Sequence, residues 1–339
     1  MYQVLHAGED SITDERWRQY FEFLTELKKR YHTPYTLVSW QTTRDRTMSQ
    51  VKDEKGSHRA LVMKDGRLVA FIGQNGRNIG TPRQSAFFVF DFLDEFTGPE
   101  LERTILDQIG KWMDRYALAE SFSIVNDAHR EGVVRRWGAR ELSRVDEYVL
   151  ERRSACREVI DGWLKEIPKK HSDLELRFYQ MLPDEYIDPF SVLLAETLRA
   201  MPQESDGALP FHTMVQNEKK AEAWRQKNGI SVYKYLLFDP DDNMIALTLV
   251  SVDLNNPTNV FQLMTGVTEK LRFQGLAKWL KAAMFYKLEE DCPGNEKIIT
   301  GMRSLNRPMQ AINSQMGFEL ARRGFEFKLT PEIIATCST

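Results

Sequence analysis

The hydrophobic pattern of this chain alternates between strand and helix periodicity, and the same order of elements occurs twice. In the first half, Asp65-Gly66 separates two apolar runs and predicts a tight hairpin turn. The elements expected in the first half are a helix over 11–31, strands over 58–63, 68–72 and 85–92, a helix over 99–116, a strand over 120–125, a short helix over 127–136 and returning strands over 140–151.

The second half opens with a strand and a helix and then reaches a loop rich in Pro and Gly over 201–211. The elements expected in the second half are a strand over 174–182, helices over 183–200 and 213–228, strands over 231–238, 244–253 and 259–267, a helix over 275–290, a strand over 297–302 and closing strands over 318–329. The order of the first half is thereby repeated.

Glycine spacing supports this internal repeat. Gly98 and Gly138 are 40 residues apart, and Gly275 and Gly317 are 42 residues apart. We therefore expect an N-terminal domain over 1–151 and a C-terminal domain over 174–339. The stretch 152–173 is dense in charge and contains a proline, so it is expected to connect the domains.

One turn in the second half has the features of a phosphate site. An apolar strand over 259–267 is followed closely by the helix over 275–290. A helix N-terminus presents unpaired N–H groups and a positive dipole end to an anion. Arg272 adds positive charge, and Gly275 removes the Cβ that would hinder close approach. The sequence predicts a strand–turn–helix phosphate cradle.

The motif Arg272-x-x-Gly275-x-Ala277 resembles the pyrophosphate loop of the GNAT superfamily of acyl-CoA N-acyltransferases, written [Q/R]-x-x-G-x-[G/A]. A later strand, Asn306 and the Gly317-Phe318 turn follow in the order typical of that family. The resemblance implies an α+β fold of two tandem GNAT-like domains, each a mixed, largely antiparallel sheet flanked by helices. It also implies acetyl-CoA as co-substrate and direct transfer of the acetyl group to an amine.

The resemblance also assigns residues to acetyl-CoA. Main-chain contacts with the pantetheine arm fall to Met264, Thr265 and Val267, and Asn306 and Met309 line its far side. The pyrophosphate falls to the backbone of Arg272, Phe273, Gln274, Gly275, Leu276 and Ala277. Many family members carry an acidic Tyr where this chain has Asn313, which cannot donate a proton usefully at neutral pH but could hydrogen-bond the sulfur or the pantetheine amides.

The first copy differs at the corresponding loop. Glu95 stands where the second copy has Arg272, and Asp94 and Glu100 add two further carboxylates. Like charges at about 4 Å repel by about 1 kcal/mol in water and by more in a partly buried site. We expect no ordinary CoA binding there, and a structural role or a contribution to the acceptor site instead.

The general base is left open. Glu204 and Asp206 lie in the 201–211 loop, where the resemblance places the acceptor, and Asp253 ends a strand expected to face the same cleft. With Asn313 they are the candidate catalytic residues, although each carboxylate taken alone is better explained as a solvated or capping residue. Together, acidic groups at this position would favour a cationic amine.

Charge, hydropathy and cysteine content limit the classes of partner, cellular location and metal site that can be expected. A net charge of -3 and a pI near 6.2 give no general argument for nucleic acid or an anionic membrane. No 18-residue apolar run and no signal-peptide pattern are present, so a cytoplasmic protein is expected. Three distant cysteines form neither a disulfide framework nor a zinc pattern, and no metal is expected.

The function expected from the sequence is N-acetylation of a primary amine, on a small molecule, by the C-terminal domain of a monomer or homodimer. A non-catalytic acyl-CoA-binding or regulatory protein is the alternative, and Asn313 favours it slightly. An aminoacyl-tRNA-dependent ligase of the Fem type also pairs two GNAT-like units. Such ligases need no pyrophosphate loop and generally show a basic surface, so this chain fits them poorly.

Overall fold

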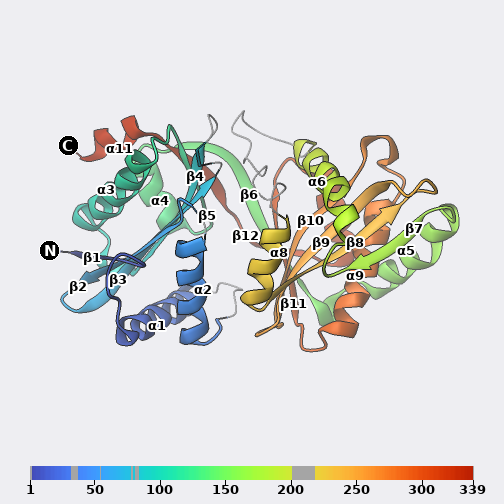
Figure 1. Ribbon diagram of the computed structural model, residues 1–339, viewed down its shortest axis with the longest axis horizontal. Coiled ribbons are helices and arrows are strands. Elements are labelled where there is room, and N and C mark those ends of the chain that lie inside the picture. The colour runs from blue at the N-terminus through green and yellow to red at the C-terminus, as the bar shows by residue number, and fades with distance from the viewer. Residues whose placement is uncertain are drawn as a thin grey trace. The chain divides into compact units, whose positions relative to one another are not determined.

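The computed structural model describes residues 2–31, 37–53, 55–77, 79–80, 84–200 and 218–338. The chain forms two compact units: unit 1 is Met1–Val145 with Arg323–Thr339, and unit 2 is Asp146–Arg322. The helices and strands of both are shown in Figure 1.

Unit 1 is built on a sheet in the order β1-β2-β3-β4-β5-β13-β6. Its strands are β1 (Gln3–His6), β2 (His58–Lys64), β3 (Arg67–Arg77), β4 (Ser85–Phe92), β5 (Ser121–Val125), the first part of β6 (Arg140–Glu151) and β13 (Phe325–Leu329). Its helices are α1 (Asp14–Tyr31), α2 (Trp40–Asp53), α3 (Pro99–Arg115), α4 (Ala128–Arg136) and α11 (Pro331–Ser338). The pairing is antiparallel except between β4 and β5, which are parallel over Ala86–Phe87 and Ser121–Phe122.

Alternation along the strands gives unit 1 two cores. Leu61 and Met63 of β2 pack with α1 and α2 on one face of the sheet, whereas Ala60 and Val62 pack with α3, α4 and α11 on the other. Successive side chains of a strand point to opposite faces, so both cores come from the same strands.

Unit 2 repeats this plan with the sheet order β6-β11-β10-β9-β8-β7, and β12 pairs with β6. Its strands are the second part of β6, β7 (Glu175–Tyr179), β8 (Ile230–Phe238), β9 (Met244–Asp253), β10 (Asn259–Val267), β11 (Lys297–Arg303) and β12 (Glu319–Arg322). Its helices are α5 (Arg157–Lys170), α6 (Asp184–Arg199), α8 (Glu218–Lys227), α9 (Leu276–Asp291) and α10 (Arg307–Met316). Strands β10 and β11 are parallel, as β4 and β5 are in unit 1.

The helices of unit 2 also cover both faces of its sheet. Leu193 and Leu194 of α6 pack on one face with Leu236 and Leu247 of β8 and β9. Helices α5 and α9 cover the opposite face, where Figure 1 shows them beside each other. The expected α+β architecture of two similar units, each with a mixed sheet and flanking helices, is confirmed.

The compact units do not coincide with the domain ranges expected from the sequence. Residues 157–170 form α5, whose Trp163 and Ile167 pack against α9, so this segment is part of unit 2 rather than a connection. Strand β13 pairs with β5 and β6, and α11 packs on the core of unit 1 through Ile334. The last strand and helix therefore complete unit 1, although they follow unit 2 in sequence.

Candidate active site

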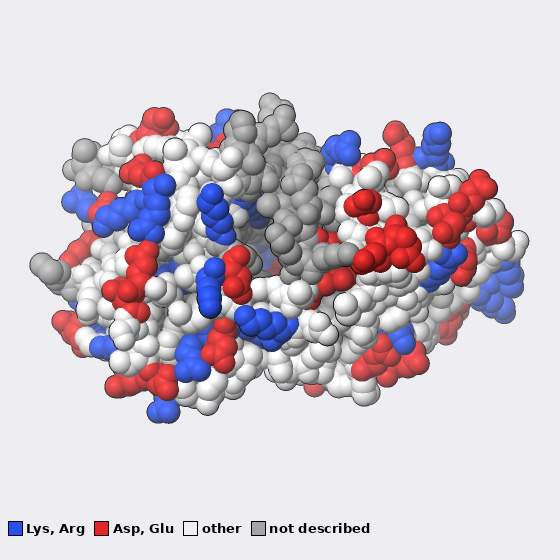
Figure 2. All heavy atoms as spheres, viewed as in Figure 1, with Lys and Arg blue, Asp and Glu red and all other residues white. Residues whose placement is uncertain are grey.

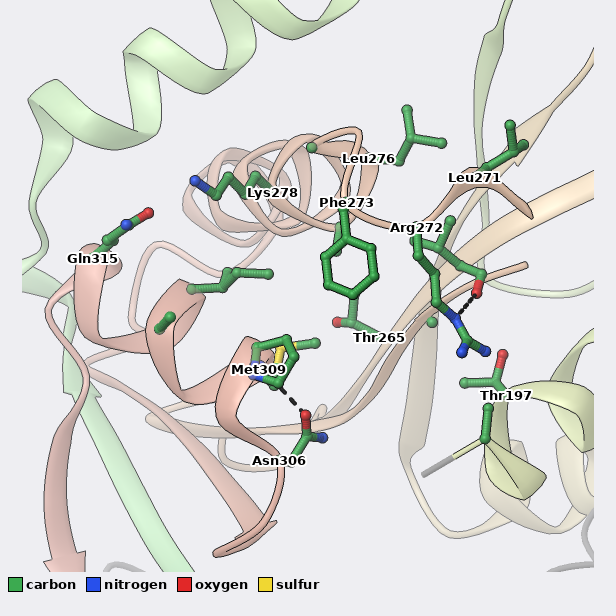
Figure 3. A pocket seen from close by; sticks show the side chains of 18 residues that line it. Thr197, Thr265, Leu271, Arg272, Phe273, Leu276, Lys278, Asn306, Met309 and Gln315 are labelled. Atoms are coloured by element: carbon green, nitrogen blue, oxygen red, sulfur yellow. Dashed lines mark hydrogen bonds between the residues drawn. The ribbon is translucent and has the colours of Figure 1, made fainter. Parts of the chain in front are cut away.

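A cavity of about 560 Å³ lies in unit 2 where β10 and β11 separate. The two strands pair only over Asn259–Phe261 and Lys297–Ile299, and beyond these residues they diverge. The end of β10, the loop before α9, the start of α9, helix α10 and the end of α6 line the opening (Figure 3).

The loop between β10 and α9 has the conformation that its sequence predicts for anion binding. Gly275 adopts φ +90°, in the left-handed region that glycine tolerates, and α9 begins at the next residue. Among the residues that the structure describes, no side chain caps this helix and no acidic residue occupies its first turn. The first N–H groups of α9 are therefore available to a ligand.

Arg272 and Phe273 of this loop both line the cavity, but only Arg272 is held by a hydrogen bond. Arg272 donates from Nε to the carbonyl oxygen of Val267 at 3.3 Å, and Figure 3 shows its guanidinium directed toward Thr197 of α6. Phe273 adopts φ +65° and is 93% exposed. A bulky side chain rarely adopts such a φ, which marks the loop as locally strained.

Most of the predicted cofactor residues line this cavity: Thr265, Val267, Arg272, Phe273, Gly275, Leu276, Ala277, Asn306 and Met309. Three do not. Gln274 turns its carbonyl to His171, Met264 is 8% exposed with its carbonyl bound from within the sheet, and Asn313 is 2% exposed. Asn306 also accepts a hydrogen bond from the N–H of Met309 and so caps α10.

Several lining residues were not predicted from the sequence. Pro308, Ala311, Ile312 and Gln315 form one face of α10, and their helical spacing was a usable signal. Thr197 of α6 gave no such signal, because it comes from a distant helix. Its hydroxyl is buried and has no hydrogen-bond partner among the described residues.

Gly266 is required for the contact between β10 and α6. A Cβ at this position would lie 2.1 Å from Cγ2 and 2.4 Å from Oγ1 of Thr197. We expect Gly266→Ala to lower the free energy of unfolding by about 1–3 kcal/mol, as overpacking does elsewhere. The measurement is urea denaturation.

In the background Thr197→Ala, which removes those two atoms and leaves the Cβ of residue 197 at 2.8 Å, the same substitution should cost less. Gly294→Ala is the matched control, because a Cβ there meets nothing within 4 Å. It should change stability by at most about 0.5 kcal/mol. If Gly266→Ala lowered the free energy of unfolding equally in wild type and in Thr197→Ala, the close contact between Gly266 and Thr197 would be contradicted.

A second cavity, of about 210 Å³, lies between α6, α8 and the sheet. Its walls are mostly apolar and include Leu263, the extra residue of a β-bulge in β10. Buried Lys234 binds Glu222 at 2.7 Å, and Arg225 binds Glu218 at 3.0 Å. Burial lowers the pKa of Lys234, and its carboxylate neighbours oppose that shift.

The predicted catalytic candidates are not gathered in either cavity. Asp253 is the last residue of β9 and accepts a hydrogen bond from the N–H of Asn255, and it lines neither cavity. Glu204 and Asp206 lie outside the described residues. The carboxylate that lines the second cavity, Glu218, belongs to α8, a helix that sequence reasoning had not connected with the site.

The strand of unit 1 that corresponds to β10 is β4, which carries a row of aromatic side chains. Phe88, Phe90 and Phe92 stack along β4, and Trp137 packs on Phe90. Arg130 of α4 pairs with Asp91 of β4. Strand β4 therefore carries stacked aromatic rings and an ion pair to α4.

The acidic loop of unit 1 is neutralised from within the unit. Glu95 binds Arg30 at 2.7 Å and Arg67 at 3.2 Å, and the hydrogen bond from Arg30 lowers the pKa of Glu95. Gly98 before α3 has φ 166°, which is ordinary extended backbone. The geometry that makes an anion site in unit 2 is absent from the described residues of this loop.

The described residues contain no cluster suited to a metal ion and no helix long and apolar enough to cross a bilayer. Figure 2 shows acidic and basic side chains intermixed over the visible face of each unit. Neither unit presents a continuous basic surface on that face.

Comparison with solved structures decides the fold. A tandem GNAT protein from the clavulanic acid biosynthesis pathway, solved without AcCoA, matches with a TM-score of 0.73 over 98% of both chains. The chain has the tandem GNAT fold. Sequence identity to that protein is 16%, so the similarity concerns the fold and not the substrate.

Other solved structures agree over nearly the whole chain. A GCN5-related N-acetyltransferase from Sphaerobacter thermophilus matches with a TM-score of 0.62 at 11% identity, covering 97% of this chain and 96% of its own. A GNAT-family acetyltransferase from Colwellia psychrerythraea matches with a TM-score of 0.51 at 13% identity, covering 97% and 100%. No family model and no curated protein matches the sequence.

Proposed function

We propose that this tandem GNAT protein is an N-acetyltransferase that moves an acetyl group from acetyl-CoA to a primary amine of a small molecule, through unit 2. The observation that carries the proposal is the loop from Arg272 to Ala277. It brings an uncapped helix N-terminus, a left-handed glycine and a guanidinium to one end of a 560 Å³ cavity between diverging strands.

The lining of the cavity fits an extended thioester with a phosphorylated end. The loop N–H groups and Arg272 provide donors for a diphosphate, while Pro308, Ala311 and Ile312 of α10 offer an apolar wall to the uncharged arm. When bound, acetyl-CoA supplies an activated acyl carbonyl and a thiolate leaving group. The amine forms the new C–N bond, the C–S bond breaks, and one proton leaves the amine.

The protein's share of this chemistry is positioning and electrostatic stabilisation. A main-chain N–H at the bulge of β10 can donate to the developing oxyanion. Asn313 cannot protonate the thiolate, and because it is buried and does not line the cavity, it makes no contact with the pantetheine arm there. Thiolate departure without an acid is feasible for a thiol with a pKa of about 8.5.

The second cavity is the proposed acceptor site, because Leu263 of the bulge is part of its wall. Glu218 in its wall is paired with Arg225, and Lys234 in its wall is paired with Glu222, so these charges are largely compensated. The acceptor that fits is a small amine with an apolar body. Trp224 contributes a buried Nε1–H with no described partner, which suits a hydrogen-bond acceptor on that molecule.

The test is calorimetric titration with acetyl-CoA, followed by free-thiol release with a panel of small amines. We expect one site per chain and thiol release that depends on the amine. Gly275→Ala should weaken acetyl-CoA binding about tenfold or more, because the backbone must leave φ +90° and turn the loop N–H groups away.

Gly66→Ala is the matched control, since Gly66 has φ +80°, lies in the β2–β3 hairpin and has nothing within 4 Å of its Cβ position. It carries similar backbone strain and should leave binding unchanged. Two sites per chain would overturn the assignment to unit 2. Binding without thiol release for any amine would favour a non-catalytic acyl-CoA-binding protein, which Asn313 makes the second candidate.

A further inference from the structure

Lys281 of α9 is buried, although the side chain of a lysine in water ends in a charged ammonium group. It is 2% exposed, and none of the described residues places a carboxylate within ion-pairing distance of it. Its Nζ donates to Oε1 of Gln262 at 3.2 Å and lies 5.2 Å from the centroid of the Phe318 ring. Burying an ionisable group with so little compensation is unfavourable, so the position calls for an explanation.

Gln262 is the residue before the bulge of β10 and is hydrogen-bonded at both ends of its amide. Its Nε2 donates to the carbonyl oxygens of Leu249 at 2.9 Å and Met264 at 3.0 Å. Those carbonyls flank the register shift between β9 and β10. A bulge disrupts the regular ladder, and here one side-chain amide takes over its hydrogen bonds.

Hydroxyl groups complete the network around Gln262. Thr248 donates to the carbonyl of Met264 at 3.2 Å and shares a hydrogen bond of 2.8 Å with the hydroxyl of Thr265. Thr300 of β11 donates to the carbonyl of Gln262 at 3.2 Å, directly after the last paired residue of that strand. The network therefore spans the point at which β10 and β11 separate.

The peptide between Met264 and Thr265 connects this network to the cavity. In a trans peptide the C=O and the following N–H point in opposite directions. Holding the carbonyl of Met264 inward thus fixes the N–H of Thr265 outward, and Thr265 lines the larger cavity.

We propose that Lys281 is a positioning residue of the acyl-transfer site: it fixes Gln262, and Gln262 fixes the bulge peptide so that its N–H donor faces the acyl thioester. The expected effect on kcat rests on the proposed acetyl transfer, whereas the structural role of Lys281 does not. Lys281 touches neither substrate nor cavity, and acts through Gln262.

Among the residues that the structure describes, no charged group approaches Lys281 from the elements packed against α9. The charged side chains of α5 and β8 are engaged or exposed elsewhere: Arg157 with Glu289, Asp161 with Tyr286, Glu166 with Lys169, Lys234 with Glu222, and Glu158, Lys165 and Lys170 toward solvent. Asp253 of β9 holds the following turn, and Lys297 of β11 pairs with Glu151. Burial alone lowers the pKa of Lys281, to about 7.

The test compares wild type with Lys281→Met, Gln262→Met and the double variant. We expect Lys281→Met to lower kcat about tenfold or more while the Kd for acetyl-CoA stays within about threefold. Because Lys281 acts through Gln262, adding Lys281→Met to Gln262→Met should lower kcat no further.

Amide hydrogen exchange over 259–267 gives a readout that does not require turnover. Exchange should be faster in Lys281→Met than in wild type and unchanged in Lys165→Met, the control on exposed α5 surface. Unchanged exchange, or kcat effects that multiply in the double variant, would overturn the proposal. Absence of acetyl-CoA turnover in wild type would remove the proposed function, while the exchange result would still decide whether Lys281 holds the bulge.

Discussion

Arg272→Glu is expected to reduce acetyl-CoA affinity at least about 100-fold. The substitution replaces a guanidinium that lines the cavity beside the helix N-terminus by a carboxylate. Unit charges about 4 Å apart interact with about 4 kcal/mol at an effective dielectric constant near 20, so exchanging attraction for repulsion easily exceeds the 2.7 kcal/mol that 100-fold requires. Calorimetric titration with acetyl-CoA measures the loss directly.

The control for this variant comes from the first copy of the motif. Glu95→Gln changes the residue that corresponds to Arg272, where the carboxylate binds Arg30 and Arg67 at the surface. Exposed ion pairs contribute little to stability, so the variant should fold and bind acetyl-CoA as wild type does. Retained affinity in Arg272→Glu would mean that the loop of unit 2 is not the diphosphate site.

Lys281→Met is expected to stabilise the protein at pH 7 and to destabilise it near pH 10. The pKa of Lys281 is about 7 in the folded protein, compared with 10.5 for an ordinary lysine. Between these values the unfolded state binds more protons, so wild-type stability rises with pH across that window and is lowest at and below pH 7. The difference of ~3.5 pH units corresponds to ~4–5 kcal/mol, which methionine avoids.

Methionine also removes the Nζ donor to Oε1 of Gln262. Leaving this buried oxygen without a hydrogen bond costs about 1–3 kcal/mol of stability at every pH. The net expectation is a gain of about 2 kcal/mol at pH 7 that becomes a loss of about 1–2 kcal/mol near pH 10. Urea denaturation of both proteins at the two pH values gives the difference. The control Lys165→Met should differ from wild type by the same small free energy of unfolding at both pH values. A Lys281→Met variant that is less stable at both pH values would contradict the depressed pKa.

The backbone conformation of the loop between β10 and α9 was predictable from the sequence because its determinants are local. A strand, Arg272, Gly275 and a helix start within about twenty residues of each other, and the backbone conformation follows from the glycine and the helix end. The side chains that meet this loop from elsewhere were not predictable. Thr197 reaches it from α6, and no periodicity relates the two segments.

Buried lysines were missed for a different reason. Lys234 follows Val232 and precedes Leu236 on the same face of β8, and Lys281 adjoins Leu280 in α9. Lysines at such positions usually extend their ammonium groups to solvent, so sequence patterns place them at the surface. Only the partners, Glu222 and Gln262, reveal that both remain inside.

The position of β13 has a consequence for how the protein is made. Unit 1 begins at the N-terminal end of the chain, yet β13 fills the place between β5 and β6 in its sheet. During synthesis the ribosome adds the whole of unit 2 before this strand emerges, which at ~5–20 residues per second takes on the order of ten seconds or more. For that time the edges of β5 and β6 are unpaired, and nascent unit 1 is a template for strand addition by other chains. Chaperone dependence should therefore be greatest for the half of the protein that is translated first.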